Sequence, residues 1–114
     1  PGVFAPIADF ELMLKTVELA RAAEQKVTVG NVLSSDVFYY DDPDNSELWK
    51  KMGVMALEME SASLYMNAAR LGKKALTICT VTDNILTGEK LTTEQRQTNL
   101  NGMIELALNV AAEI

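Results

Sequence analysis

The sequence predicts an α/β fold built around a largely parallel sheet. Stretches with helical spacing of apolar residues alternate along the chain with short, continuous apolar runs, and such runs are typical of strands buried on both faces. This alternation is the pattern of strands joined by crossover helices. With 114 residues, of which 48% are apolar, the chain has the size of one small domain or of part of a larger one.

A helix and a strand are predicted first. Residues Ile7 to Ala23 carry apolar side chains near helical spacing, and Asp9 is suitably placed to cap the first turn. Residues Lys26 to Ser34 are rich in β-branched side chains and place apolar ones on one period-2 face, which predicts a strand.

A short helix, a buried strand and a longer helix are predicted in the middle of the chain. Ser46 follows a polar loop and could cap the short helix, which runs to about Met52 and stops at Gly53. Val54 to Leu57 is a continuous apolar run of the kind found in buried strands. Glu58 to Arg70 is rich in good helix formers.

A third strand and a final helix are predicted in the last part of the chain. Gly72 ends the preceding helix, and Ala75 to Val81 is the second continuous apolar run. Thr92 and Gln95 have capping-box spacing at the start of a helix that continues to near the last residue. Three strands make a thin sheet whose two faces both need cover, so we expect other segments to complete it.

Composition and charge exclude several kinds of site. The net charge is −6 and the ten basic residues are scattered, which argues against a nucleic-acid surface. Histidine is absent, so this chain holds no Ser-His-Asp triad, Cys-His pair or imidazole metal site. The single cysteine, Cys79, excludes an intrachain disulfide, favours a cytosolic protein and is expected to be a small buried side chain.

Two features concern the ends and the environment of the chain. No apolar run approaches the ~20 residues of a membrane span, and we expect no secretory signal. The sequence begins Pro1-Gly2 without a methionine, which suggests a cleaved product or a partial chain, although removal of an initiating methionine alone gives the same start.

Candidate binding residues follow two of the predicted strands. In open α/β sheets, ligands bind beyond the carboxyl ends of the strands, and acidic side chains occur there at Glu58, Glu60 and Asp83. A carboxylate can accept hydrogen bonds from sugar hydroxyls, and a carboxyl group that holds a proton can donate it to a leaving group. From spacing alone, favourable placement at a helix start explains the glutamates as well, and an Asx-turn explains Asp83.

Arg96 and the aromatic run Phe38-Tyr39-Tyr40 are further candidates. Arg96 is unfavourably placed for the dipole of the last helix, so it could face a carboxylate instead of solvent. Aromatic rings can stack on a planar heterocycle, although rings that follow a strand are more often part of a core. None of these signals alone identifies a function.

Taken together, several segments resemble the hexameric, bacterial-type purine nucleoside phosphorylases. These segments are Gly30 to Tyr39, Leu57 to Ala62, Ala75 to Asp83 and Glu94 to Thr98. The second alone is shared across the nucleoside phosphorylase superfamily, whereas its combination with the last is more specific. The resemblance runs from about Ile7 to the end of the chain. It implies that residues 1–114 are the carboxy-terminal part of a single domain with a three-layer α/β fold, whose mixed, largely parallel sheet is flanked by helices.

The resemblance implies phosphorolysis, in which a purine nucleoside and phosphate give the free base and ribose 1-phosphate. No cofactor is expected, because phosphate is the co-substrate. By the resemblance, Glu60 holds the ribose hydroxyls, Met59 packs against the sugar, and Phe38 flanks the base. The remaining binding residues, which help to form the pocket, are Leu57, Glu58 and Thr82.

The resemblance also implies catalytic roles for Asp83 and Arg96. Asp83 would be the general acid that protonates the purine at N7, and Arg96 would pair with it and assist that transfer. Because a nearby arginine favours an ionised aspartate, we expect Arg96 to approach during closure or to shift the proton to the base once the nucleoside is bound. Asn84 stands where family members commonly have histidine, which leaves the detail of base recognition open.

Part of the site is expected to lie outside this chain. In the family, a longer amino-terminal part carries the glycine and arginine residues that hold phosphate, and no such cradle is found here. A hexamer, site residues from a neighbouring subunit, a cytoplasmic location and a part in purine salvage are implied in the same way.

Two other functions remain open at this point. One is a nucleoside hydrolase of the same superfamily, which would use water instead of phosphate and which the Glu94 to Thr98 segment disfavours. The other is a catalytically incomplete fragment that binds purines or serves in assembly.

Overall fold

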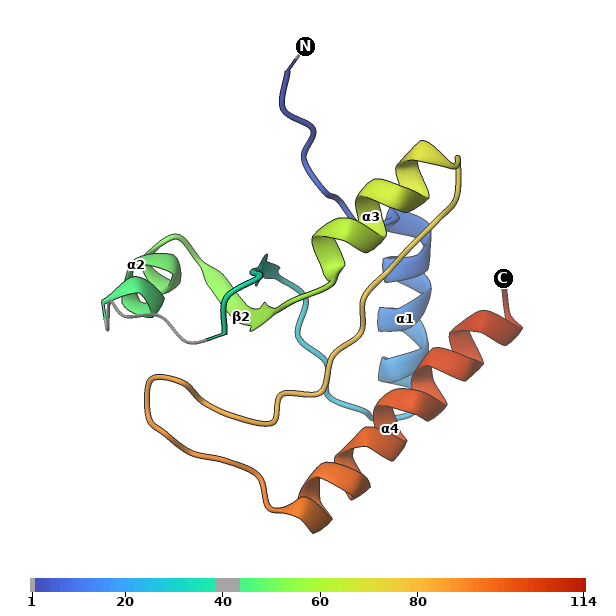
Figure 1. The fold of residues 1–114 in the computed structure, drawn as a ribbon. Helices are drawn as coiled ribbons and strands as arrows, with labels where there is room; N and C mark the ends of the chain where they lie inside the picture. Colours follow the sequence, from blue (N-terminus) through green and yellow to red (C-terminus); the bar gives the residue numbers. More distant parts are fainter. Residues whose placement is uncertain (1, 39–43) are drawn as a thin grey trace.

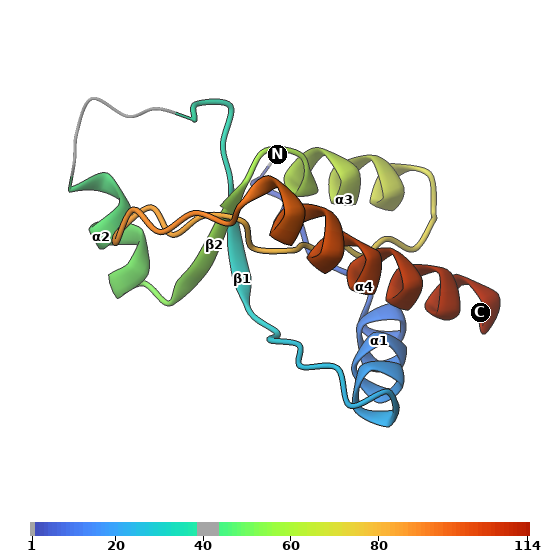
Figure 2. The same ribbon diagram turned by 90° about the horizontal axis from the view of Figure 1, so that it is seen from below.

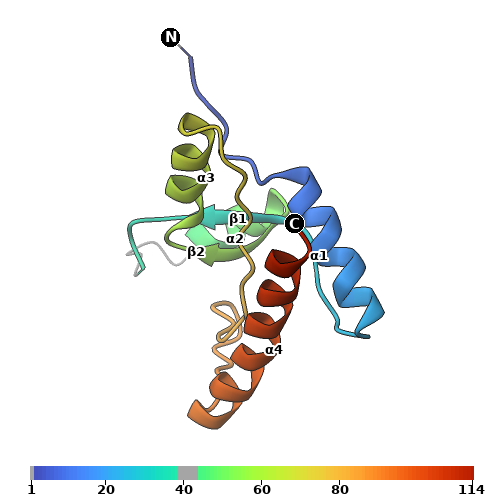
Figure 3. The same ribbon diagram turned by 90° about the vertical axis from the view of Figure 1, so that its right-hand side faces the viewer.

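The computed structural model describes residues 2–38 and 44–114 and confirms an α/β arrangement with a small parallel sheet (Figure 1). Figure 3 shows α3 above the two strands and α4 below them. In chain order the elements are α1 (Phe10–Ala22), β1 (Asn31–Ser34), α2 (Asn45–Lys51), β2 (Val54–Glu58), α3 (Ser61–Arg70) and α4 (Thr93–Ala112).

The sheet consists of β1 and β2, which run parallel to each other. Leu33 pairs with Leu57, and Ser34 pairs with Glu58 at the carboxyl end of both strands. Two parallel neighbours cannot be joined by a tight turn, because the chain must return to the end of the sheet at which the first strand began. The connection between β1 and β2 makes this return and contains α2 (Figure 2). The register therefore brings a hydroxyl and a carboxylate together where ligands of parallel sheets bind.

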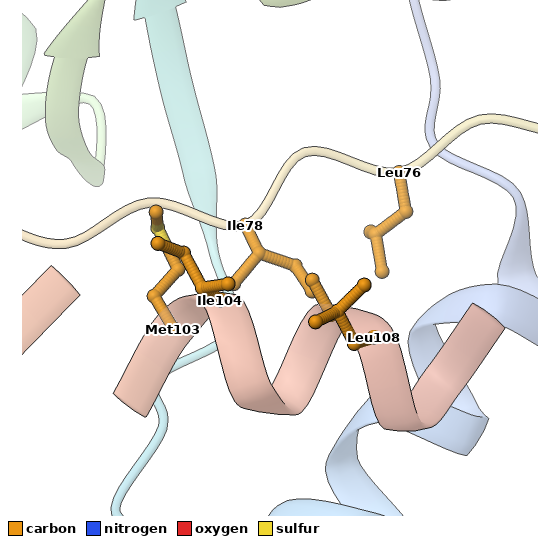
Figure 4. A pocket seen from close by; sticks show the side chains of 6 residues that line it. Leu76, Ile78, Met103, Ile104 and Leu108 are labelled. Carbon is orange, nitrogen blue, oxygen red and sulfur yellow. The ribbon is translucent and has the colours of Figure 1, made fainter. Parts of the chain in front are cut away.

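The third predicted strand, Ala75 to Val81, is wrong for this structure, because the segment is unpaired within the described part of the chain. It runs back past α3 (Figure 1), where Ser61 Oγ donates a hydrogen bond to Thr77 Oγ1 over 2.9 Å. On its other side, Leu76 and Ile78 face the apolar side of α4 (Figure 4). An apolar run of this kind becomes a strand only where a neighbouring backbone supplies hydrogen bonds.

The first predicted strand is shorter than expected for the same reason. It was expected from Lys26 to Ser34, and only Asn31–Ser34 pairs with β2. The residues before Asn31 have strand-like composition but no paired neighbour among the described residues.

The core lies between α1 and α4, which pack against each other (Figure 3). The buried apolar side chains of the described residues are Ala20, Leu106 and Val110, and Leu12 and Leu19 pack against them. Three buried apolar side chains are few for the length of chain that the structure describes, so most of its apolar residues keep contact with solvent.

Several helix ends match the signals in the sequence. The side chain of Asp9 accepts a hydrogen bond from a first-turn amide of α1. Thr92 and Gln95 form the reciprocal capping box at the start of α4. Gly53 and Gly72 follow α2 and α3 with positive φ angles of 80° and 63°, a conformation that glycine adopts without strain.

Three predicted helix starts are wrong. The first helix begins at Phe10 and not at Ile7, because Asp9 takes the cap position. Ser46 lies inside α2, whose cap position is Asp44. The third helix begins at Ser61 and not at Glu58, because Glu58 still pairs with Ser34 in the sheet. Glu60 takes the cap position of α3.

The chain exposes much more surface than a closed domain of its size. Its accessible surface is 8984 Å², whereas a folded monomer of this length exposes about 6,200 Å². Large apolar side chains such as Val29, Met55 and Leu108 are exposed. In the part of the chain that the structure describes, no helix combines the length and apolar character needed to cross a membrane.

Candidate active site

The carboxylate of Glu58 is held at the end of β2 by groups on both of its oxygens. Ser34 Oγ donates a hydrogen bond to Oε1, and Oε2 accepts hydrogen bonds from the backbone amides of Glu60 (2.7 Å) and Ser61 (2.6 Å). Partial burial raises the pKa of Glu58, but these hydrogen bonds outweigh it and bring the pKa below its ordinary value. Glu58 is thus an ionised group whose lone pairs are directed into the protein.

Glu60, two residues further on, has an exposed carboxylate, in contrast to Glu58. Its amide is held by Glu58, and its carbonyl accepts hydrogen bonds from the Ser63 hydroxyl and the Leu64 amide at the start of α3. Its side chain is exposed, and its carboxylate makes no hydrogen bond or ion pair with another described residue. A fixed backbone therefore presents an acceptor group that a ligand could use. Met59, between the two glutamates, is 39% exposed.

Asp83 and Arg96 contact each other directly. Arg96 Nη2 donates a hydrogen bond to Asp83 Oδ1 over 3.1 Å, and Thr82 Oγ1 donates to Asp83 Oδ2 over 2.7 Å. The sequence left open whether Arg96 faces a carboxylate or solvent, and in the structure it faces the carboxylate of Asp83. No closure is needed to join the pair in this structure.

Local structure explains why these two residues meet. Asp83 forms an isolated antiparallel bridge with Lys90, and the Leu91 amide donates to the carbonyl of Thr82 over 2.8 Å. The two ends of the loop therefore lie side by side. The capping box begins α4 directly after the loop and places Arg96 in the first turn of that helix. Because both side chains are partly exposed, the ion pair contributes little stability and serves mainly to orient the two groups.

Two further predicted binding residues, Leu57 and Phe38, belong to β2 and to the segment after β1. Leu57 is half-buried in β2, and Phe38, which follows β1, is 55% exposed. Tyr39 and Tyr40, predicted with Phe38 as a possible stacking run, lie outside the described residues.

A hollow of about 740 Å³ lies between β1, residues 75–81, α1 and α4. Gly30, Cys79 and Met103 are among the residues that line it, and none of the predicted site residues does so. Glu58 and Glu60 thus lie at the end of β2, whereas Asp83 and Arg96 meet at the loop that leads into α4. The mostly apolar hollow is lined by other residues.

Cys79 corrects one expectation. It was predicted to be buried, but its side chain is exposed, because the segment that carries it lacks neighbours on one side. Desolvation raises the pKa of the Cys79 thiol, and the negative charges of Glu58 and Glu60 raise it further. The thiol is therefore held in its protonated, less nucleophilic form.

Sequence reasoning did not single out Ser34, Ser61 and Thr77, which hold the strand ends together. The predicted strands ended at Ser34 and at Leu57, and Glu58 was assigned to the helix that follows. Pairing those two ends would have placed Ser34 beside Leu57, one residue away from the observed pairing of Ser34 with Glu58.

Comparison with known sequences identifies the group of proteins to which this arrangement is related. The sequence profile of the phosphorylase superfamily matches residues 1–114. The chain belongs to the phosphorylase superfamily. The resemblance drawn from the four segments between Gly30 and Thr98 is confirmed.

Individual members of the superfamily with high similarity are DeoD-type purine nucleoside phosphorylases. The chain is 50% identical over 105 residues to the protein of that name from Proteus mirabilis, an alignment that covers 92% of the chain and 44% of the relative. It is 48% identical over 111 residues to the Geobacillus protein, covering 97% of the chain and 47% of the relative. A Vibrio parahaemolyticus protein, named as DeoD-type 2, is 50% identical over 111 residues with the same coverage. The chain thus spans less than half the length of these relatives.

Proposed function

We propose that this chain takes part in the phosphorolysis of purine nucleosides, which gives a free purine base and ribose 1-phosphate. The observation that carries the proposal is the 50% identity over 105 residues to a relative named purine nucleoside phosphorylase. The contrast between the inward carboxylate of Glu58 and the exposed one of Glu60 supports it, because a sugar needs an accessible acceptor.

The nucleoside would be bound at the carboxyl ends of the strands. Glu60 would accept hydrogen bonds from the ribose hydroxyls, and Met59 would pack against the sugar. Phe38 would flank the base. The other residues of the pocket would be Leu57, Glu58 and Thr82. No cofactor is needed, since phosphate is the nucleophile.

Asp83 would act as the general acid and Arg96 as its partner. A phosphate oxygen attacks the sugar carbon as the glycosidic bond breaks, and the bonding electrons leave with the base. A proton moves from the carboxyl group of Asp83 to N7 of the purine, which removes the charge that develops on the leaving group. Arg96 Nη2 lies 3.1 Å from Asp83 Oδ1, so its charge favours the carboxylate that remains after the transfer.

The phosphate site and part of the sheet would come from other segments. We infer a further, amino-terminal segment of the same protein because the relatives are about twice as long as this chain and the exposed surface is 8984 Å². The hollow beside residues 75–81 is the natural place for additional strands. With them, the chain would form the three-layer fold of a cytoplasmic, hexameric enzyme of purine salvage, in which a neighbouring subunit also contributes to the site.

A nucleoside hydrolase is the second candidate, because it would use the same Glu58-Met59-Glu60 and Asp83 residues. Product analysis separates the two reactions. With inosine and phosphate, the full-length protein that carries this chain should release ribose 1-phosphate, which phosphorus NMR detects. Free ribose as the sole sugar product would favour the hydrolase. No product from the full-length protein would leave a purine-binding fragment as the better description.

A further inference from the structure

Three consecutive amides at the start of α3 are bound by only two side chains. Glu58 Oε2 accepts from the amides of Glu60 and Ser61 at 2.7 and 2.6 Å, and Ser34 Oγ accepts from the amide of Ala62 at 2.9 Å. The same serine donates its proton to Glu58 Oε1. Amides at a helix start have no partner within the helix, so this pair of side chains fixes the conformation of the turn.

The network continues into the segment that leads to Asp83. Ser61 is 2% exposed, and its hydroxyl donates to Thr77 Oγ1 over 2.9 Å. The Thr77 amide in turn donates to the Tyr65 hydroxyl over 3.0 Å. The turn that carries Glu60 is thus tied to residues 75–81, and this segment runs on to Asp83.

We infer that Ser34 and Glu58 are positioning residues, which hold the Met59-Glu60 turn so that the carboxylate of Glu60 points out toward the sugar. This inference rests on the proposed function, because it takes Glu60 as the acceptor of the ribose hydroxyls. It assigns Ser34 a part in sugar recognition without any contact between Ser34 and the substrate. The lowered pKa of Glu58 agrees with it, since an ionised carboxylate is the form that accepts both amides.

A double-mutant cycle in the full-length protein tests the coupling. S34A removes a charge-assisted hydrogen bond, and we expect kcat/KM for inosine to fall about 10-fold. In an E60Q background, S34A should change kcat/KM by less than about twofold, because the group that Ser34 positions has already been altered. S34T keeps the hydroxyl and should recover most of the loss. S46A, in α2, is a matched control that should leave the activity unchanged.

The substrate provides a second readout. With 2′,3′-dideoxyinosine, which lacks the hydroxyls that Glu60 would bind, S34A should have little effect on kcat/KM. An equal loss in the wild-type and E60Q backgrounds, or with both substrates, would overturn the inference, because it would show a general structural role for Ser34.

Hydrogen exchange provides a readout that does not depend on activity. S34A should speed exchange of the amides of Glu60, Ser61 and Ala62 by about 10-fold or more and leave those of α2 unchanged. Unchanged exchange at these three amides would overturn the inference even if inosine is not a substrate. An inactive wild-type enzyme with the expected exchange pattern would instead contradict the proposed function and leave the positioning network standing.

Discussion

Arg96 Nη2 lies 3.1 Å from Asp83 Oδ1, which joins the first turn of α4 to the end of the segment that follows α3. The two residues are 13 positions apart in the sequence, and the loop between them returns through the Asp83–Lys90 bridge. Asp83, the proton donor of the proposed reaction, is thus already in contact with the guanidinium group of Arg96.

If this pair transfers the proton, its two members act as a unit. D83N should lower kcat for inosine by about 10²- to 10⁴-fold, the usual contribution of a general acid. R96A should lower it by less, and the double variant should be no worse than D83N alone. K90A is the control, because only the backbone of Lys90 meets Asp83. Unchanged turnover in R96A would remove Arg96 from the mechanism.

The Glu58 carboxylate should make the free energy of unfolding depend on pH in the acidic range. Its pKa in the folded chain lies below the ordinary value of 4.5, so its stabilising effect is complete above that value and is lost as the pH falls through the lowered pKa. E58Q should therefore be less stable near neutral pH and should lose less stability between about pH 6 and pH 3. Urea unfolding of the full-length protein measures both. E89Q, at an exposed glutamate, should follow the wild type, and equal pH profiles for E58Q and wild type would contradict the assignment.

The capping box at the start of α4 should contribute to the free energy of unfolding. T92A removes the side-chain acceptor for the Gln95 amide and should lower the free energy of unfolding of the full-length protein by about 1 kcal/mol. T93A, one residue further into the helix, should have a smaller effect. Equal losses in the two variants, measured by chemical denaturation, would show that the cap contributes nothing specific.

Cys79 should react slowly although it is exposed. Desolvation and the charges of Glu58 and Glu60 raise the pKa of its thiol, so little thiolate is present near neutral pH. Iodoacetamide should label the chain more slowly than it labels a free cysteine peptide, and an E60Q variant should label faster. Labelling of the wild-type chain faster than the peptide would contradict this. Further protection in the full-length protein would support a segment that fills the hollow lined by Cys79.

Local signals in the sequence predicted the features that depend on neighbouring residues. The cap at Asp9 and the capping box of Thr92 and Gln95 were predicted correctly, because each bond joins residues within three positions of each other. The glycine stops at Gly53 and Gly72 follow from backbone conformation alone.

Features that depend on distant segments were not predictable in the same way. Ala75 to Val81 has the composition of a buried strand, but pairing requires an edge that the described residues do not provide. The burial expected for Cys79 failed for the same reason. The partnership of Ser34 with Glu58 spans 24 positions and depends on the register of two strands, which apolar patterns do not specify.

The most direct test of phosphorolysis is the release of hypoxanthine from inosine by the full-length protein that carries this chain, measured with and without phosphate. We predict release only when phosphate is present, with one ribose 1-phosphate formed for each base and with both products lost in D83N. Release at the same rate without phosphate, with free ribose as the second product, would contradict phosphorolysis and assign the chain to a nucleoside hydrolase.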